Sequence, residues 1–189
     1  IDCLINAAGF TGEAMLNTNY NFFEKFENYN FKLWQKTLNE NLSSTFIVTK
    51  SVAKHMLKRK KGSIINIASD VGIISPDHRI YEPNKRYKYK GVNFNTPIAY
   101  SVAKSGIISM TRYLATYWAK KGIRVNCISP AGVYKKHNKK FVEQLSQRIP
   151  LGRMAKSYEL NGAIIYLCSN ASSFVTGHNL VVDGGRTIW

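Results

Sequence analysis

Tyr100 and Lys104 stand four residues apart and form the pair in this sequence best suited to move a proton. Within a predicted helix over residues 99–120, this spacing places both side chains on one face, one turn apart. A tyrosine by itself has a pKa of about 10 and is a poor base at neutral pH. Because an adjacent ammonium group favours the phenolate, we expect Lys104 to lower the pKa of Tyr100 and to bring proton transfer into range.

Four short apolar runs indicate the elements that must position this pair. Near-continuous hydrophobicity over such short lengths is typical of parallel strands that are covered on both faces. The runs are Ile1–Asn6, Ser63–Ala68, Ile123–Ile128 and Asn179–Val182. Helical stretches separate them, at about 31–60, 99–120 and 158–169. This alternation predicts one α/β domain over residues 1–189, built on a doubly wound parallel sheet.

Each of the first three predicted strands leads into a turn of small or polar residues. The turns are Asn6-Ala7-Ala8-Gly9, Ser69-Asp70-Val71-Gly72 and Ser129-Pro130-Ala131-Gly132-Val133. In open α/β sheets, ligands bind at the carboxyl ends of the strands. We therefore expect the three turns to converge on one edge of the sheet, where Ser69 would hydrogen-bond a reacting oxygen and hold it against Tyr100.

Two predicted helices end in the same pattern, Lys60-Lys61-Gly62 and Lys120-Lys121-Gly122. Cations suit the negative C-terminal end of a helix, and glycine suits the left-handed residue that follows it. We expect both glycines to take that conformation directly before a strand. The polar, basic and aromatic stretch Ser75–Pro97 fits no element, and its length indicates a functional or disordered loop.

The net charge of +16 raises the question of a polyanionic partner. The basic residues are spread over most of the chain, so nucleic acid is not expected as the main partner. No apolar run approaches the roughly 18 residues of a membrane span, which argues against a membrane partner. Cys3, Cys127 and Cys168 lie among apolar neighbours without metal-ligand spacing, so we interpret them as buried free thiols and expect no metal site. Free thiols favour a reducing, cytoplasmic location.

Several short motifs occur in a characteristic order along the whole chain. They are Asn6-Ala7-Ala8-Gly9, Asn41 within Glu-Asn-Leu, Ser69, Tyr100 with Lys104, Pro130-Ala131-Gly132, and Val175-Thr176-Gly177 followed by Val182-Asp183-Gly184-Gly185. In this order they resemble the short-chain dehydrogenases/reductases, which are NAD(P)-dependent and have a Rossmann-like fold. The resemblance implies a catalytic tetrad of Asn41, Ser69, Tyr100 and Lys104, in which Tyr100 exchanges a proton while the nicotinamide exchanges a hydride.

The resemblance also implies a role for each remaining motif. Ser69 would orient the substrate oxygen, Lys104 would hold the cofactor ribose and tune Tyr100, and Asn41 would order a water that relays protons to Lys104. The residues Asn6, Ala7, Ala8 and Gly9 would line the adenosine and ribose region, and Pro130, Ala131, Gly132 and Val133 would line the nicotinamide.

Family elements that precede the first predicted strand have no counterpart in this sequence. They are a Gly-rich phosphate loop, a helix, and a strand whose end selects NAD or NADP. We therefore expect the chain to be the larger, C-terminal part of a Rossmann-like domain that lacks its N-terminal strands and Gly-rich loop. Such a part would hold the dinucleotide weakly, would leave Ile1–Asn6 as an unpaired edge, and does not distinguish NAD from NADP.

Two basic segments flank the expected site. Their cations are Arg79, Lys85, Arg86, Lys88 and Lys90 in the long loop, and Lys135, Lys136, Lys139, Lys140 and Arg148 after the third strand. Two basic walls favour an anionic small-molecule substrate such as a sugar phosphate, a sugar acid or a nucleotide-linked sugar. The segments Pro76–Tyr81, Ile149–Met154 and Gly185–Trp189 are similar to oxidoreductases of surface-glycan and flagellin-modification pathways. That similarity implies a sugar or amino-sugar intermediate on the way to a nonulosonic acid.

Two alternative functions stay open. One is a 3-oxoacyl-carrier-protein reductase, whose acidic carrier would suit a basic surface, although the long loop would obstruct a pantetheine-linked chain. The other is a catalytically silent binding or assembly subunit, against which the presence of all four tetrad residues counts. The family resemblance also implies a homo-dimer or homo-tetramer that pairs through the helices at 31–60 and 99–120.

Overall fold

The main sheet of the computed structural model has four parallel strands. The structure describes residues 1–10, 23–81, 88–89, 92–93 and 95–189. The strands are β1 (Cys3–Asn6), β2 (Gly62–Ile67), β5 (Ile123–Pro130) and β6 (Asn179–Val182), in the order β1-β2-β5-β6. Every neighbouring pair is parallel, so the carboxyl ends of all four strands lie at one edge, as the sequence predicts.

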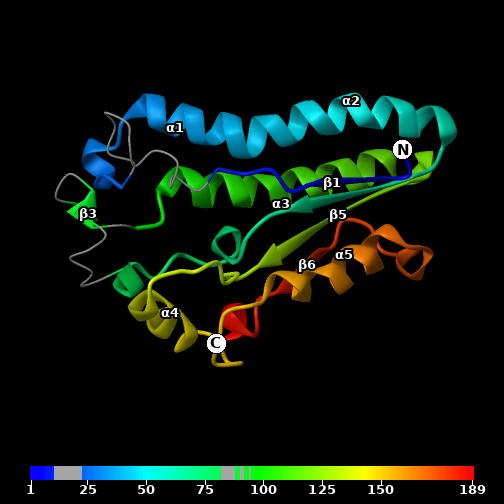
Figure 1. Ribbon diagram of the computed structural model, residues 1–189. Helices are drawn as coiled ribbons and strands as arrows, with labels where there is room; N and C mark the ends of the chain where they lie inside the picture. The colour runs from blue at the N-terminus through cyan, green and yellow to red at the C-terminus, as the bar shows by residue number, and fades with distance from the viewer. Residues whose placement is uncertain (11–22, 82–87, 90–91, 94) are drawn as a thin grey trace.

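Helices cover both faces of this sheet, which confirms the α/β doubly wound fold. They are α1 (Phe31–Leu38), α2 (Ser44–Arg59), α3 (Ile98–Trp118), α4 (Lys139–Ser146) and α5 (Asn161–Cys168). The helices α2 and α3 pack on one face of the sheet, α1 continues the line of α2, and α5 packs on the opposite face (Figure 1).

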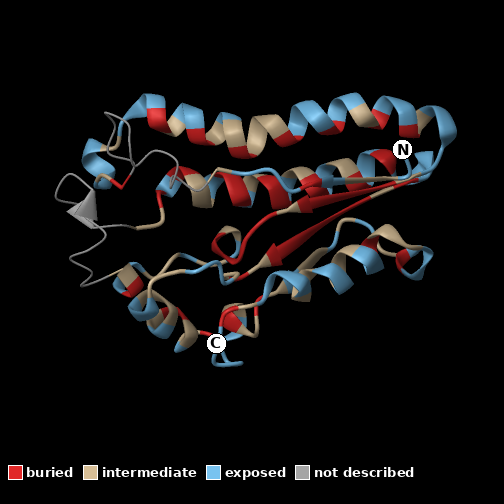
Figure 2. Cartoon of the chain, in the orientation of Figure 1, coloured by how far each residue is buried: buried red, intermediate tan, exposed pale blue. Residues whose placement is uncertain are grey.

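The side chains of the central strands alternate between the two helical layers. Ile64 and Val125 pack in one cluster with residues of α2 and α3, while Ile65 and Ile128 pack in another with Leu167 of α5. Successive strand residues point to opposite faces, so a strand that is covered on both sides needs apolar residues at nearly every position. Figure 2 accordingly shows β2 and β5 as the buried strands of the sheet.

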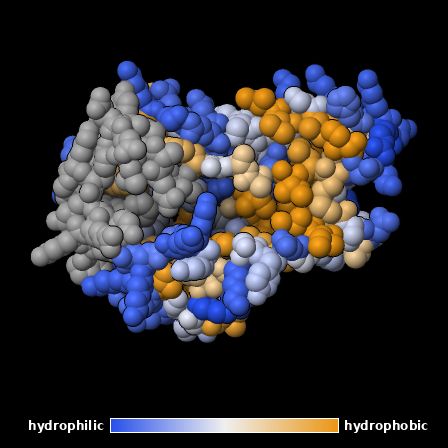
Figure 3. Space-filling view, in the orientation of Figure 1, coloured by the Kyte–Doolittle hydropathy of each residue, from blue (hydrophilic) through white to orange (hydrophobic). Residues whose placement is uncertain are grey.

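β1 lies at an edge of the sheet, as expected. Among the described strands it pairs with β2 alone, and Ile1 and Ile5 are 58% and 43% exposed. Apolar surface gathers over this part of the molecule, where β1 runs between α2 and α5 in the view of Figure 1 (Figure 3). This edge of the sheet is therefore covered less completely than its centre.

The helix predicted over residues 31–60 is interrupted in the middle. Asn39–Ser43 forms a π-helical turn, η3, between α1 and α2. Such turns insert one extra residue into a helix and are frequent at functional sites. The helix predicted over 158–169 likewise begins with a 3₁₀ turn, Ser157–Leu160 (η8), before α5.

Short elements occupy part of the predicted loop Ser75–Pro97. They are the 3₁₀ turn η5 (His78–Tyr81) and an antiparallel pair of strands, β3 (Lys88–Tyr89) and β4 (Val92–Asn93). The rest of that loop, at 82–87, 90–91 and 94, falls outside the described residues. Other 3₁₀ turns are η2 (Phe26–Asn28), η4 (Asp70–Gly72), η7 (Ala119–Lys121), η9 (Asn170–Ser172) and η10 (Arg186–Ile188).

The expectation of a left-handed glycine is confirmed at Gly122 and wrong at Gly62. Gly122 has a φ of 73°, but α2 ends on Lys60, which takes the left-handed conformation itself with a φ of 51°. Gly62 already belongs to β2, where a Cβ would lie 2.4 Å from the Met56 Sδ atom. Glycine is therefore required at position 62 because a side chain would not fit between helix and strand. At position 122 it is required because the backbone is left-handed.

Gly122→Ala is expected to destabilise the fold by about 3 kcal/mol or more. The new Cβ would add left-handed strain and would stand 2.1 Å from the Lys60 carbonyl oxygen, which is backbone and cannot step aside. Gly152→Ala is the matched control, because Gly152 has a φ of 69° with nothing within 4 Å of the Cβ. It should cost only the strain, about 1 kcal/mol. Denaturant unfolding of both variants measures the difference in the free energy of unfolding. Equal losses in the two variants would show that the contact with the Lys60 carbonyl oxygen has no effect.

Candidate active site

Ser69 and Asp70 follow β2 at the edge where the strands end. Both side chains are buried. The Ser69 Oγ donates a hydrogen bond to Asp70 Oδ1 at 2.8 Å, and the backbone N–H of Val71 donates to the same oxygen at 2.8 Å. The Asp70 carboxylate thus stabilises the start of the turn η4 and fixes the Ser69 hydroxyl next to it.

The first turns of α3 carry Tyr100 and Lys104 to the same place. A Cβ at Gly72 would lie 2.9 Å from the Lys104 carbonyl carbon, so only glycine lets η4 approach α3 this closely. The Ser105 hydroxyl donates to the Gly72 carbonyl oxygen at 3.0 Å and closes the contact. As a result the Tyr100 hydroxyl comes within hydrogen-bonding reach of Ser69.

The pKa of Tyr100 is raised to about 12, which corrects the expectation that Lys104 lowers it. Burial of the phenol is the largest cause, because it disfavours the charged phenolate. The side-chain hydrogen bond between Tyr100 and Ser69 opposes this rise in the pKa, and the negative charge of Asp70 adds to it. The Lys104 Nζ lies 5.5 Å from the centre of the Tyr100 ring, over the ring. The helical spacing was therefore right, but the ammonium is not placed against the phenolic oxygen.

Lys104 is itself buried, with 5% of its surface exposed. Its Nζ donates to the Ile67 carbonyl oxygen at 2.9 Å, at the end of β2. Burial lowers the pKa of Lys104 to about 8, because a charged amine loses its water shell there. An ammonium has three N–H donors, and the bond to Ile67 uses one of them.

Asn41 lies fully buried in the π-helical turn η3. Its Nδ2 donates to the Phe10 and Thr37 carbonyl oxygens at 3.0 Å each, and its Oδ1 accepts from the Phe10 N–H at 3.0 Å. A Cβ at Gly9 would lie 3.2 Å from Asn41 Oδ1 and 3.7 Å from Lys104 Nζ. The turn after β1 therefore packs closely against Asn41 and Lys104. The water relay through Asn41 stays a prediction.

Asn6 ties the end of β1 to its neighbours. Its Nδ2 donates to Thr49 Oγ1 of α2 and to Asn66 Oδ1 of β2, both at 2.8 Å. Asn66 in turn donates to Thr111 Oγ1 of α3 at 2.9 Å. The amide nitrogen of Asn6 thus has protein partners, while the next three residues, 7–9, are exposed at the edge of the sheet and can meet a ligand.

The turn after β5 lies beneath α4. The Ala131 N–H donates to the Val182 carbonyl oxygen at 3.3 Å, which joins the turn to the end of β6. A Cβ at Gly132 would lie 2.5 Å from a methyl group of Leu145 in α4. Pro130 and Val133, at the two ends of the turn, are partly exposed. The predicted residues 130–133 thus share the strand-end edge with Ser69.

The segments around η5 and α4 pack against each other. Tyr81 stacks on Phe141 with ring centres 5.7 Å apart. The Asp77 carboxylate pairs with Arg79 at 2.8 Å and with Arg148 at 2.5 Å. The Arg79 and Arg148 guanidinium groups hold the pKa of Asp77 well below its usual range. Two cations of the predicted basic walls therefore share one carboxylate, which balances only one of their two charges.

The remaining cations of the walls divide into three groups. Lys135, Lys136 and Lys140 are exposed, and Lys139 lies 4.0 Å from Glu143. Lys85, Arg86 and Lys90 lie outside the described residues, as does the side chain of Lys88. The described part of the walls is thus less strongly basic than the sequence suggested.

The sequence prediction missed two residues that the structure brings to Ser69. Asp70 accepts the Ser69 hydrogen bond, and Arg186 of η10 forms a buried ion pair with Asp70. An acidic residue directly after the candidate serine was a visible signal for Asp70. No local signal pointed to Arg186, because 116 residues separate it from Asp70.

Two properties of the described residues concern metal ions and membranes. In the described part of the chain, no three His, Cys, Asp or Glu side chains are grouped so that they could hold a metal ion. Within the same residues, no helix combines the length and apolar character needed to cross a membrane.

Comparisons with known proteins agree along the whole chain. A family model described as short chain dehydrogenase matches residues 1–81, and one described as enoyl-(acyl carrier protein) reductase matches residues 86–187. The 2-dehydro-3-deoxy-D-gluconate 5-dehydrogenase of Bacillus subtilis is 36% identical, over 98% of this chain and 64% of that protein. The 3-oxoacyl-(acyl-carrier-protein) reductase of Thermotoga maritima is 34% identical, over 100% of this chain and 67% of that protein.

Solved structures show the same likeness. A short chain dehydrogenase from Leptospira borgpetersenii with bound NAD+ superposes with a TM-score of 0.84 at 36% identity, over 99% of this chain and 65% of that one. A gluconate 5-dehydrogenase from Burkholderia cenocepacia, in complex with NADP and tartrate, gives 0.80 at 29% identity, over 99% and 65%. The chain thus spans about two thirds of the length of these relatives.

Proposed function

Because this chain belongs to the short-chain dehydrogenase family, we propose that it forms the larger part of an NAD(P)-dependent oxidoreductase that interconverts an alcohol and a carbonyl. The observation that carries this proposal is the meeting of Ser69, Tyr100 and Lys104 at the carboxyl ends of the strands. The three come from two elements that Gly72 allows into contact.

The geometry supports a proton-transfer role for Tyr100. With its pKa near 12, the phenol is protonated at neutral pH and is ready to donate to the oxygen of a carbonyl substrate. The Ser69 hydroxyl, beside the phenol, would hold that oxygen in line. In the reverse direction Tyr100, as the phenolate, would accept the alcohol proton.

The residues at this edge suit a nicotinamide dinucleotide. Lys104 has N–H donors beyond the one that Ile67 accepts, as a ribose diol requires. Gly9 brings an exposed backbone next to this amine, and residues 130–133 form the opposite side of the same edge. A bound nicotinamide would supply or accept the hydride. Either NAD or NADP fits these residues, and solved relatives contain each of them.

A sugar or sugar-acid derivative is the substrate that we favour. The relatives above include dehydrogenases named for gluconate derivatives, and one of them was solved with tartrate, a hydroxy acid. Exposed Lys135, Lys136 and Lys140 would draw an anionic substrate toward the site. Within this class we propose an intermediate of surface-glycan or flagellin modification, on the strength of the segments 76–81, 149–154 and 185–189.

A second candidate is a 3-oxoacyl-carrier-protein reductase. It is favoured by the relative from Thermotoga maritima and by the description of the family model that matches residues 86–187. The contacts of η5 with α4 speak against it. The Tyr81–Phe141 stack and the Asp77–Arg148 pair join these two segments, and we propose that they would obstruct a long acyl chain.

Assays of the full-length protein separate these functions. We expect NAD(P)-linked oxidation of sugar acids or amino sugars at a kcat/KM at least about tenfold above that for acetoacetyl thioesters, a margin of about 1.4 kcal/mol. Faster turnover of the thioesters would instead support the carrier-protein reductase. Absence of NAD and NADP binding by calorimetry would support a silent binding or assembly subunit.

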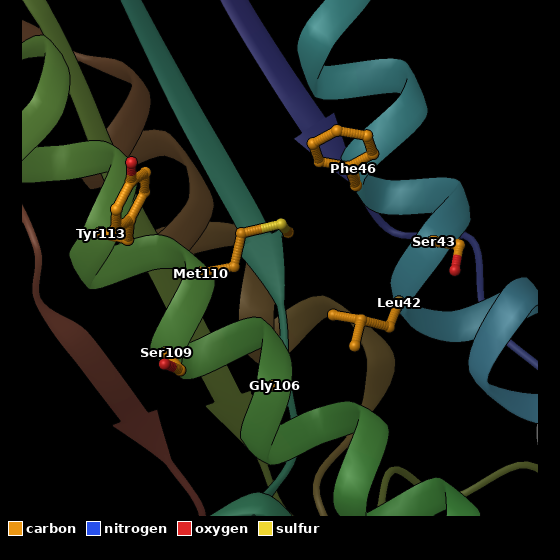
Figure 4. A pocket seen from close by; sticks show the side chains of 7 residues that line it. All are labelled: Leu42, Ser43, Phe46, Gly106, Ser109, Met110 and Tyr113. Atoms are coloured by element: carbon orange, nitrogen blue, oxygen red, sulfur yellow. The ribbon is translucent and has the colours of Figure 1, made fainter.

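We also propose that the protein forms a homo-dimer or homo-tetramer through α2 and α3. Phe46 and Tyr113 project from these helices and are 52% and 66% exposed. A shallow apolar groove runs between the two helices (Figure 4). It is lined by Leu42, Ser43, Phe46, Gly106, Ser109, Met110 and Tyr113. A second copy of the chain would cover this apolar surface from water.

A further inference from the structure

A buried ion pair lies directly behind the contact between Ser69 and Tyr100. Asp70 and Arg186 are only 3% and 7% exposed. Arg186 Nη1 donates to Asp70 Oδ2, and the other carboxylate oxygen accepts from Ser69 Oγ and from the Val71 N–H. An ionised carboxylate is only an acceptor. The Ser69 hydroxyl hydrogen therefore points toward Asp70, and its oxygen stays beside Tyr100.

The C-terminal turn is built to present Arg186 at this point. The Asp183 carboxylate accepts hydrogen bonds from the Gly185 N–H at 2.8 Å and from the Thr187 N–H at 2.7 Å, so it closes η10 around Arg186. Gly185 has a φ of 91°, and a Cβ there would lie 2.8 Å from the Pro150 ring. The guanidinium is thus delivered by a rigid turn and not by a free chain end.

Resting on the proposed oxidoreductase function, we infer that Asp70 and Arg186 are positioning residues of this site. Asp70 holds the Ser69 hydroxyl against Tyr100, and Arg186 cancels the Asp70 charge that would otherwise act on the phenol. Because the two charges are opposite, loss of one partner should disturb Tyr100 in one direction and loss of the other in the opposite direction. If the pair only stabilised the fold, the two substitutions would not shift the pKa of Tyr100 in opposite directions.

Among the described residues, the charges of Asp70 in η4 and Tyr81 in η5 act on Tyr100. Lys104 of α3 lies over the Tyr100 ring, and Arg186 of η10 pairs with Asp70. The charge of Asp70 raises the pKa of Tyr100, as does Tyr81. Tyr100 itself ionises in the alkaline range. The direction in which each substitution should shift the pKa of Tyr100 is therefore defined.

The first test is an ultraviolet titration of the tyrosines in the full-length protein without substrate. The Tyr100→Phe form of each variant is subtracted, so that the difference reports Tyr100. Asp70→Asn leaves the Arg186 cation uncompensated and should lower the pKa of Tyr100 by about one pH unit. Arg186→Met should raise it. The double variant should lie between the two. Shifts of the same sign, or no shift in folded singles, would overturn the inference.

The second test keeps the inference falsifiable if the single variants do not fold, since an unpaired buried charge is costly. The double variant Asp70→Asn/Arg186→Met has no charge but keeps an oxygen that accepts from Ser69. Asp70→Leu/Arg186→Met removes that oxygen too. We expect about tenfold lower kcat in the second double variant, with cofactor Kd within about twofold. Equal kcat values in the two would contradict the positioning of Ser69 by Asp70.

The two tests distinguish this inference from the proposed function. A parent protein that turns over no alcohol or carbonyl would refute the proposed function, while the tyrosine titration would still report on the ion pair. An active parent with opposed shifts supports both. An active parent with unopposed shifts refutes only the role of the pair.

Discussion

Tyr100→Phe is expected to lower kcat by about 10³-fold while leaving cofactor affinity within about twofold. The substitution removes one oxygen and keeps the ring, which packs over Lys104. The fold and the cofactor edge should therefore persist, and only proton exchange with the reacting oxygen should be lost. Steady-state kinetics in both directions, together with calorimetric binding of NAD and NADP, measure the two effects in the full-length protein.

Tyr81→Phe is the matched control for this substitution. Tyr81 is a second partly buried tyrosine near the site, and its hydroxyl lies 2.6 Å from Thr96 Oγ1. Loss of this hydroxyl should change kcat less than about fivefold, because Tyr81 contacts no reacting atom in the proposed mechanism. A Tyr100→Phe variant no worse than Tyr81→Phe would show that Tyr100 is not the proton donor.

Lys104→Met is expected to abolish turnover and yet to stabilise the fold by roughly 1–2 kcal/mol at pH 7. Burial lowers the pKa of Lys104 from 10.5 to about 8, a shift equivalent to roughly 3 kcal/mol against the charged form. The lost hydrogen bond to the Ile67 carbonyl oxygen takes back about 1–2 kcal/mol of this gain. Methionine fills nearly the same volume without a charge.

The gain in stability should depend on pH with a defined sign. Between about pH 8 and 10.5, the folded protein releases the Lys104 proton while the unfolded chain still holds it. The unfolded state binds more protons there, so the parent grows more stable as pH rises. The advantage of Lys104→Met should therefore be full below about pH 8 and should turn into a loss of about 1–2 kcal/mol above about pH 10.5, where only the missing hydrogen bond to Ile67 remains. Denaturant unfolding at several pH values measures it, with the exposed Lys120→Met as control. A constant difference would refute the burial of a charged Lys104.

Local sequence pattern was sufficient to predict the sheet and most of its edge. Continuous apolar runs mark strands that are covered twice, and the four predicted strands are those of the main sheet. The spacing of Tyr100 and Lys104 on a helix was also predictable, because helical periodicity depends on neighbouring residues alone. The roles of the predicted site residues stay predictions, as do the substrate and the glycan pathway.

Features that depend on packing between distant segments could not be predicted. The π-helical turn at Asn39–Ser43 interrupts a sequence that reads as continuous helix. Lys60 takes the left-handed position that the pattern gave to Gly62, while Gly62 lies in β2 beside Met56. Helix ends are decided by the surface against which the helix docks, and a one-dimensional pattern does not contain that surface.

By itself, then, the sequence determined which residue types stand at the carboxyl ends of the strands, and hence the chemistry that is possible there. Only the tertiary structure decided how strongly each group holds its proton. Burial raises the pKa of Tyr100 and lowers that of Lys104, and neither burial is visible along the chain. The charge beside Ser69 is balanced by an arginine 116 residues away from Asp70. Solvation and electrostatic interactions act through space, so they become defined only when the segments pack together.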